Sequence, residues 1–169
     1  MYGYVKVGSA VPKLRVADCV YNKEEILKLV EAAAAKQVRV LSFPELSVTG
    51  YTCADLFFQT PLLHAAEQAI QEIAEATKAL NIFLLIGAPI AVDNQMFNCA
   101  VALYKGKLLG IVPKTHIPNY SEFYEERWFA SADDLLTEEI TYAGQNVPIG
   151  ADLIFAAADF PALKIGVEI

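Results

Sequence analysis

The chain has 169 residues, with 13 lysines and arginines against 20 aspartates and glutamates, which leaves a formal charge of −7. This length fits one domain with a substantial buried core, and an apolar content of 55% excludes a disordered chain. The acidic balance argues against nucleic acid and against an anionic membrane surface as partners, because both attract clustered basic side chains.

Signals for export or membrane insertion are not recognisable in the sequence. No apolar run approaches the ~20 residues of a membrane-spanning helix, and the start of the chain has no long apolar segment followed by a small-residue cleavage site. The cysteines are Cys19, Cys53 and Cys99, an odd set without C-x-x-C spacing, which argues against a disulfide framework or a metal site. We therefore expect a cytoplasmic protein with reduced thiols and no bound metal.

Hydrophobic periodicity predicts an alternation of strands and helices, followed by a hairpin. In chain order, the expected elements are a strand at 5–11, a helix from 22 to about 36, a strand at 38–43, a loop at 46–58, a helix at 60–81, a strand at 82–86, a hairpin of strands 97–104 and 107–112, a loop at 119–129 leading into a short helix, and strands at 153–157 and 163–167. This order predicts an α/β protein with a mixed sheet and helices on one or both of its faces.

Local signals predict where some of these elements begin and end. Asn22 is expected to cap the first helix, with an acidic residue at the capping-box distance. Thr60 is expected to cap the second helix, because Pro61 fits its first turn. Gly87 and Pro89 are expected to end the strand that precedes them.

Two charged residues follow apolar strands, each directly after a proline. Glu45 follows Pro44 and Lys114 follows Pro113. Sites in open α/β sheets form outside the carboxyl ends of strands, so this carboxylate and this ammonium could share a pocket that moves a proton and stabilises negative charge. The alternative is that both are ordinary solvated loop charges.

The residues around these two charges resemble a known family. The segments Phe43–Tyr51 and Pro113–Tyr120 resemble those that carry the catalytic glutamate and lysine of the nitrilase, or carbon–nitrogen hydrolase, superfamily. The segments Gly50–Phe57 and Asn119–Phe129 are similar to the N-terminal glutamine-hydrolysing domain of glutamine-dependent NAD⁺ synthetases. The resemblance implies an αββα sandwich and a Glu–Lys–Cys triad that hydrolyses the glutamine amide through a thioester.

The resemblance also implies a role for individual residues. Glu45 is expected to act as the general base and Lys114 as the group that stabilises the oxyanion. A second glutamate often supports the triad, and Glu125 matches its position best, with Glu122 and Glu126 as the alternatives. The aromatic residues expected to line the glutamine pocket are Tyr51, Tyr120 and Phe123.

The nucleophilic cysteine of the family follows a strand that resembles 163–169, where the given sequence stops. We therefore expect residues 1–169 to form the N-terminal part of the hydrolase domain and to be inactive alone, since Cys53 and Cys99 are expected to be packing residues. The ATP- and Mg²⁺-using synthetase domain, which amidates nicotinic acid adenine dinucleotide, would lie elsewhere, so no cofactor is expected on this chain. The expected partners are glutamine, the synthetase domain and further copies in a homo-oligomer.

Two other functions remain open at this point. One is a stand-alone amidase that acts on another small amide. The other is a non-catalytic fragment that keeps the scaffold and two members of the triad.

Overall fold

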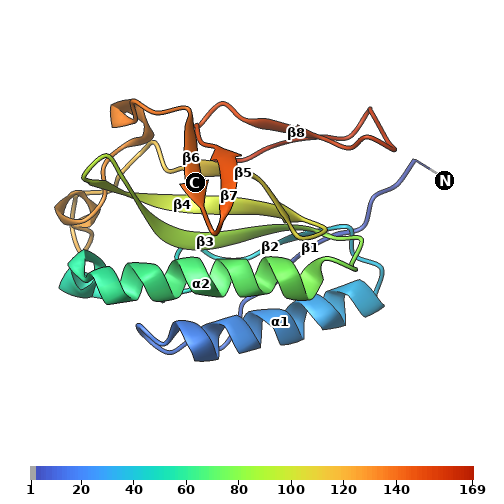
Figure 1. The fold of residues 1–169 in the computed structure, drawn as a ribbon, viewed down its shortest axis with the longest axis horizontal. Coiled ribbons are helices and arrows are strands. Elements are labelled where there is room, and N and C mark those ends of the chain that lie inside the picture. Colours follow the sequence, from blue (N-terminus) through green and yellow to red (C-terminus); the bar gives the residue numbers. More distant parts are fainter. Residues whose placement is uncertain (1–2) are drawn as a thin grey trace.

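The computed structural model describes residues 3–169. Its centre is a five-stranded mixed sheet with the order β1-β2-β3-β4-β5, seen edge-on in the middle of Figure 1. The strands are β1 (Val7–Ser9), β2 (Val40–Ser42), β3 (Phe83–Val92), β4 (Gln95–Tyr104) and β5 (Lys107–Pro113). β1, β2 and β3 are parallel, and β4 is antiparallel to both β3 and β5. The carboxyl ends of β2 and β5 therefore lie at the same edge of the sheet.

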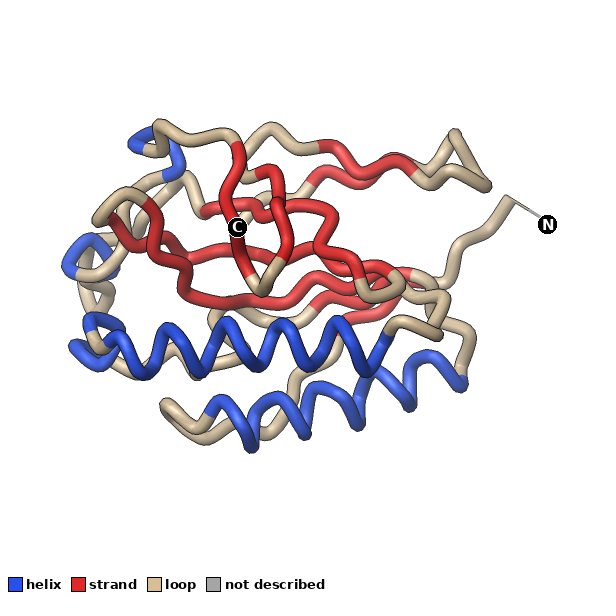
Figure 2. The backbone as a smooth tube through the Cα atoms, viewed as in Figure 1, coloured by secondary structure: helices blue, strands red, loops and turns tan. Residues whose placement is uncertain are grey.

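Two helices cover one face of this sheet, as Figures 1 and 2 show. They are α1 (Cys19–Ala35) and α2 (Thr60–Thr77). Apolar residues at helical spacing, such as Ile26 and Val30 of α1 and Ile70 and Ile73 of α2, are fully buried against the sheet residues. This burial of one apolar stripe per helix is what the periodicity predicts.

The predicted helix caps were wrong. Asp18 caps α1 by accepting a hydrogen bond from the backbone N–H of Tyr21. Asn22 lies inside the helix, fully buried, and its side chain bonds the backbone of Arg15 and Val48 instead. Thr60 is the first residue of α2 rather than its cap. Competing tertiary hydrogen bonds of this kind are invisible to a local capping pattern.

β3 runs through Gly87 and Pro89, which were expected to end it. The backbone polar groups of Phe83, Leu85 and Gly87 form hydrogen bonds on the β2 side of β3. Because alternate residues of a strand point the same way, the backbone of Pro89 faces that side too. β2 pairs with β3 only as far as Leu85. Pro89 therefore lies beyond the end of β2, and its lack of an N–H group costs no ladder hydrogen bond.

Two further hairpins flank the sheet. The pair β6 (Glu139–Tyr142) and β7 (Gln145–Pro148) was not predicted. The tip of this hairpin reaches α2, where the N–H of Ala143 donates to Glu67. The predicted strands at 153–157 and 163–167 appear as β8 (Ile154–Ala156) and β9 (Lys164–Gly166).

The β8–β9 ribbon lies on the sheet face opposite to the helices (Figure 1). Phe155 of β8 packs against Phe83 of β3 in a tilted arrangement, with the ring centroids 5.4 Å apart. Gly110 of β5 leaves the space that this ring occupies. Within residues 3–169, neither helix is apolar enough over a sufficient length to cross a bilayer.

Candidate active site

Glu45 lies on a tight turn that follows β2. The backbone of this turn rests on Gly87 of β3, where an added Cβ would lie 2.3 Å from the nitrogen of Leu46 and 2.4 Å from the carbonyl oxygen of Pro44. Backbone hydrogen bonds from Phe43 to Leu85 and from Val48 to Gly87 fix both ends of the turn. Glycine is the residue that allows this close approach of two backbones, so Gly87 is the floor of the Glu45 turn.

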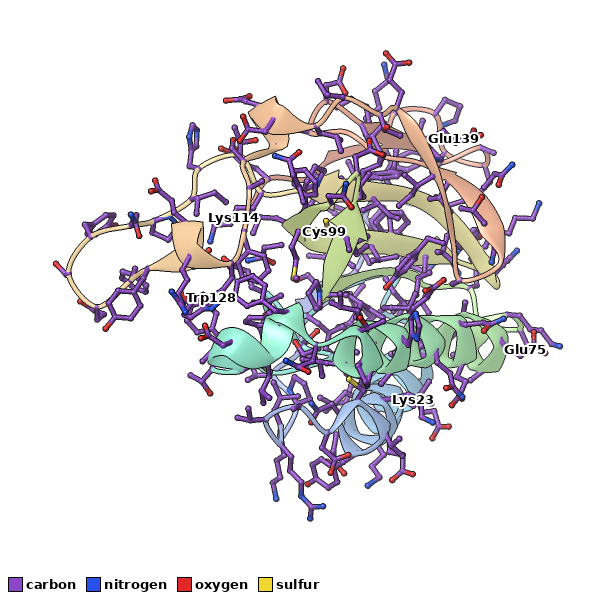
Figure 3. The ribbon with its side chains drawn as sticks, turned by 60° about the vertical axis from the view of Figure 1, so that its left-hand side comes forward. Lys23, Glu75, Cys99, Lys114, Trp128 and Glu139 are labelled. Atoms are coloured by element: carbon purple, nitrogen blue, oxygen red, sulfur yellow. The ribbon has the colours of Figure 1, made fainter. Side chains whose placement is uncertain are left out.

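Lys114 follows β5 at the same edge of the sheet. Its backbone N–H donates to the carbonyl of Asn98 in β4 at 2.8 Å. Its side chain is 8% exposed, and Nζ lies 2.9 Å from Oε2 of Glu45. The structure thus joins the two charges that the sequence placed after separate strands. Figure 3 shows Lys114 and Trp128 on the side where their loops project, with Cys99 deeper toward the sheet.

Glu125 completes the charged cluster from a third segment, η2 (Glu125–Arg127). Its carboxylate is almost fully buried, and Nζ of Lys114 lies 3.1 Å from its Oε2 and 3.4 Å from its Oε1. The hydroxyl of Tyr51 donates to the same Oε1 at 2.6 Å. Burial, together with this bond to the Glu125 carboxylate, raises the pKa of Tyr51, so the phenol stays a donor at neutral pH.

Lys114 keeps its charge between these two carboxylates. Burial alone would lower the pKa of Lys114, but hydrogen bonds and charges from Glu45 and Glu125 outweigh it, so that its pKa is raised. An ammonium group carries three N–H donors, and the two carboxylates occupy two of them. Nζ lies within 3.4 Å of three carboxylate oxygens, namely Oε2 of Glu45 and both oxygens of Glu125.

Asn98 of β4 belongs to the same cluster, although sequence reasoning missed it. Its side chain is fully buried and its Nδ2 donates to Oε2 of Glu45 at 2.8 Å. The only signal in the sequence was a polar residue between Phe97 and Cys99 in an apolar strand.

A second missed feature ties the loops of the cluster together. Arg127 forms a bidentate ion pair with Asp55, at 2.8 and 2.7 Å, and Nε1 of Trp128 donates to the same carboxylate. These bonds hold the pKa of Asp55 well below its usual range. The pair links η1 (Ala54–Phe58), which follows the Tyr51 loop, to the segment that carries Glu125.

Among the described residues, the other candidates form no hydrogen bond or ion pair with the side chains of the charged cluster. Tyr120 is 68% exposed and packs edge-on against Phe123, with the ring centroids 5.8 Å apart. Glu122 is exposed, and the exposed Glu126 accepts a hydrogen bond from Asn119. Of the three glutamates considered, Glu125 is therefore the one that lies against Lys114. A pocket-lining role for Tyr120 and Phe123 stays a prediction.

The cysteines of the chain are buried and protonated. Burial raises the pKa of Cys99 and of Cys53, and burial together with the nearby Cys53 and Asp18 raises the pKa of Cys19 to about 11. Cys99 points into the core shared with the helices, on the opposite face of β4 from its neighbour Asn98, since adjacent strand residues alternate. A thiol needs a lowered pKa to be a good nucleophile at neutral pH.

No metal-ligating cluster of three or more His, Cys, Asp or Glu side chains occurs between residues 3 and 169. The described cluster consists of two carboxylates, one ammonium group and their hydrogen-bond partners Asn98 and Tyr51.

The mixed sheet carries the cluster of Glu45, Lys114 and Glu125 at the edge where β2 and β5 end. The model of the carbon–nitrogen hydrolase family matches residues 6–169, and the chain belongs to this family.

Particular relatives are similar over nearly the whole chain. The glutamine-dependent NAD(+) synthetase of Mycobacterium leprae is 36% identical over 167 residues, which are 99% of this chain and 24% of that protein. The enzyme of the same name from Mycobacterium tuberculosis H37Rv is 34% identical over 168 residues, 99% of this chain and 25% of its own length.

A solved structure agrees with these relatives. The crystal structure of a glutamine-dependent NAD(+) synthetase from Cytophaga hutchinsonii superposes with a TM-score of 0.86 at 28% identity, over 96% of this chain and 27% of that one. The predicted α/β fold and the resemblance are thereby confirmed. The chain spans about a quarter of the length of the relatives it matches.

Proposed function

We propose that this chain is part of the glutaminase domain of a glutamine-dependent NAD⁺ synthetase, and that Glu45, Lys114 and Glu125 form its catalytic cluster. The observation that carries the proposal is the contact of Lys114 with both carboxylates at the edge where β2 and β5 end. The names and the coverage of the similar proteins support glutamine as the amide donor.

Glu45 is the general base in this proposal. Its side chain is 36% exposed, so a reacting group can reach the carboxylate, whereas Glu125 is buried. Glu45 takes the proton of a cysteine thiol as the sulfur attacks the amide carbon of glutamine, and then delivers this proton to the departing ammonia. Water activated by Glu45 hydrolyses the resulting thioester to glutamate.

Lys114 stabilises the tetrahedral intermediates. The attack converts the amide oxygen into an oxyanion, and a fixed ammonium group beside the base is suited to stabilise it. Glu125 and Tyr51 hold the ammonium in place. We assign Tyr51, Tyr120 and Phe123 to the glutamine pocket as part of the same proposal.

The thiol is the component that residues 1–169 do not provide in a reactive form, since the three cysteines are buried with raised pKa values. We propose that a cysteine elsewhere in a longer polypeptide supplies it, and that residues 1–169 alone are inactive. The ammonia then passes to a synthetase domain that uses ATP and Mg²⁺ to amidate nicotinic acid adenine dinucleotide. We place this assembly in the cytoplasm as a homo-oligomer.

Glutamine hydrolysis by the polypeptide encoded by the complete gene tests this proposal. We expect Glu45→Gln to lower kcat by ~10²–10⁴-fold, the usual contribution of general acid–base catalysis. Glu139→Gln removes the same charge from an exposed position of β6 and should leave kcat unchanged. Release of ammonia from glutamine is the measurement.

Two further results would overturn parts of the proposal. Hydrolysis of glutamine by residues 1–169 alone, sensitive to Glu45→Gln, would show that no outside thiol is needed. Hydrolysis of another small amide but not of glutamine would make the protein a stand-alone amidase.

A further inference from the structure

Asn98 makes two contacts with the proposed machinery, one from its backbone and one from its side chain. Its carbonyl accepts the backbone N–H of Lys114, and its Nδ2 donates to Oε2 of Glu45, both at 2.8 Å. It lies within β4, opposite Pro89 of β3. One residue thus connects the strand that carries the lysine loop with the carboxylate of the general base.

The hydrogen bonds of Glu45 converge on one of its two oxygens. Oε2 accepts from both Asn98 and Lys114, whereas no hydrogen bond from the described residues reaches Oε1. Asn98 is fully buried and Lys114 is nearly so, while the Glu45 side chain is 36% exposed. The arrangement holds Oε2 on the protein side and leaves Oε1 for a reacting group.

The buried side-chain amide of Asn98 lowers the stability of the fold. Its Oδ1 is buried and has no hydrogen-bond partner among the described residues, and such an unsatisfied group is destabilising. Rotating the amide would bring Oδ1 against the carboxylate of Glu45, so the charge of Glu45 sets its orientation. A buried polar group with one unmet bond calls for an explanation other than stability.

We propose that Asn98 is a positioning residue that fixes the Glu45 carboxylate through Oε2, so that Oε1 is the atom that takes the thiol proton and returns it to ammonia. The catalytic part of this inference rests on the proposed glutaminase function. The hydrogen bond itself can be tested without any activity.

A double-mutant cycle in the 169-residue chain tests the bond. Urea unfolding of Asn98→Ala, Glu45→Ala and the double variant should show a coupling of at least about tenfold in the unfolding equilibrium constant, as for a hydrogen bond to a charged group. Additive effects would overturn the proposal, because Asn98 would then only fill space.

The pH dependence of kcat tests the positioning role in the polypeptide encoded by the complete gene. The titratable groups around Glu45 are Lys114, Glu125 and Tyr51. We expect Asn98→Leu to lower kcat about tenfold or more at every pH, with little change in KM. Asn98→Asp has no donor when ionised but regains an O–H when protonated, so its kcat should recover toward wild type only at acid pH.

Asn146→Asp is the matched control, because Asn146 is exposed on β7 and an aspartate keeps the acceptor for Thr141. An unchanged profile for this variant supports the assignment. A pH-independent loss in Asn98→Asp would contradict the positioning role. If the wild-type protein releases no ammonia from glutamine, the proposed function fails, and the mutant cycle still decides whether Asn98 holds Glu45.

Discussion

Lys114→Met should destabilise the 169-residue chain by about 3–5 kcal/mol, the range for removing one partner of a buried ion pair. The variant keeps the length of the side chain but leaves the buried carboxylate of Glu125 facing Glu45 without a cation. Urea unfolding at neutral pH measures the effect. Adding Glu125→Gln to the variant should recover part of the loss, because it removes the uncompensated charge.

Lys107→Met is the control, since Lys107 is exposed at the start of β5. It should change the free energy of unfolding by less than about 0.5 kcal/mol. Equal losses in the two variants would mean that the Lys114 charge does not hold the cluster. Because the pKa of Lys114 is raised in the folded state, its stabilising contribution is fully present below pH 10.5 and is lost only as the pH rises through that higher pKa.

Gly87→Ala should destabilise the chain by about 3 kcal/mol, at the upper end of the range for overpacking. The new Cβ would meet the backbone of Pro44 and Leu46 rather than a side chain that can rotate away. The turn that carries Glu45 therefore has to move, and glutamine hydrolysis should fall together with stability. Urea unfolding and kcat in the polypeptide encoded by the complete gene are the two measurements.

Gly8→Ala provides the comparison for Gly87→Ala. Gly8 lies in β1 of the same sheet, and an added Cβ would make an ordinary 3.5 Å contact with Leu41. This change should be close to neutral or slightly stabilising. Tolerance of Gly87→Ala equal to that of Gly8→Ala would contradict the role of Gly87 as the floor of the Glu45 turn.

The strands other than β6 and β7, the β4–β5 hairpin and the two charges that follow Pro44 and Pro113 could be predicted from local pattern. Hydrophobic periodicity and strand-ending prolines are local features of the sequence. They mark Glu45 and Lys114 by position, independently of the resemblance. Glu125 depended on the resemblance, because its neighbours Glu122 and Glu126 look alike in the sequence. Only the folded chain distinguishes them, by burying Glu125 and leaving the other two exposed.

Residues whose role depends on the register between strands could not be predicted. The sequence predicts a strand end at Gly87, because its part in the Glu45 turn depends on residues 44–46 crossing β3 at that point. Asn98 falls inside the strand predicted at 97–104, and its role cannot be predicted because its partners Glu45 and Lys114 are distant in sequence. The misplaced cap at Asn22 has the same origin, a tertiary hydrogen bond to Val48.

The transfer of nitrogen from glutamine to NAD⁺ tests the central claim most directly. The polypeptide encoded by the complete gene is incubated with amide-¹⁵N-glutamine, ATP, Mg²⁺ and nicotinic acid adenine dinucleotide, and the mass of the product is measured. We predict ¹⁵N-labelled NAD⁺ from the wild type and none from Glu45→Gln, which should still make unlabelled NAD⁺ from added ammonium. Unlabelled product from the wild type, or equal labelling by Glu45→Gln, would contradict the account.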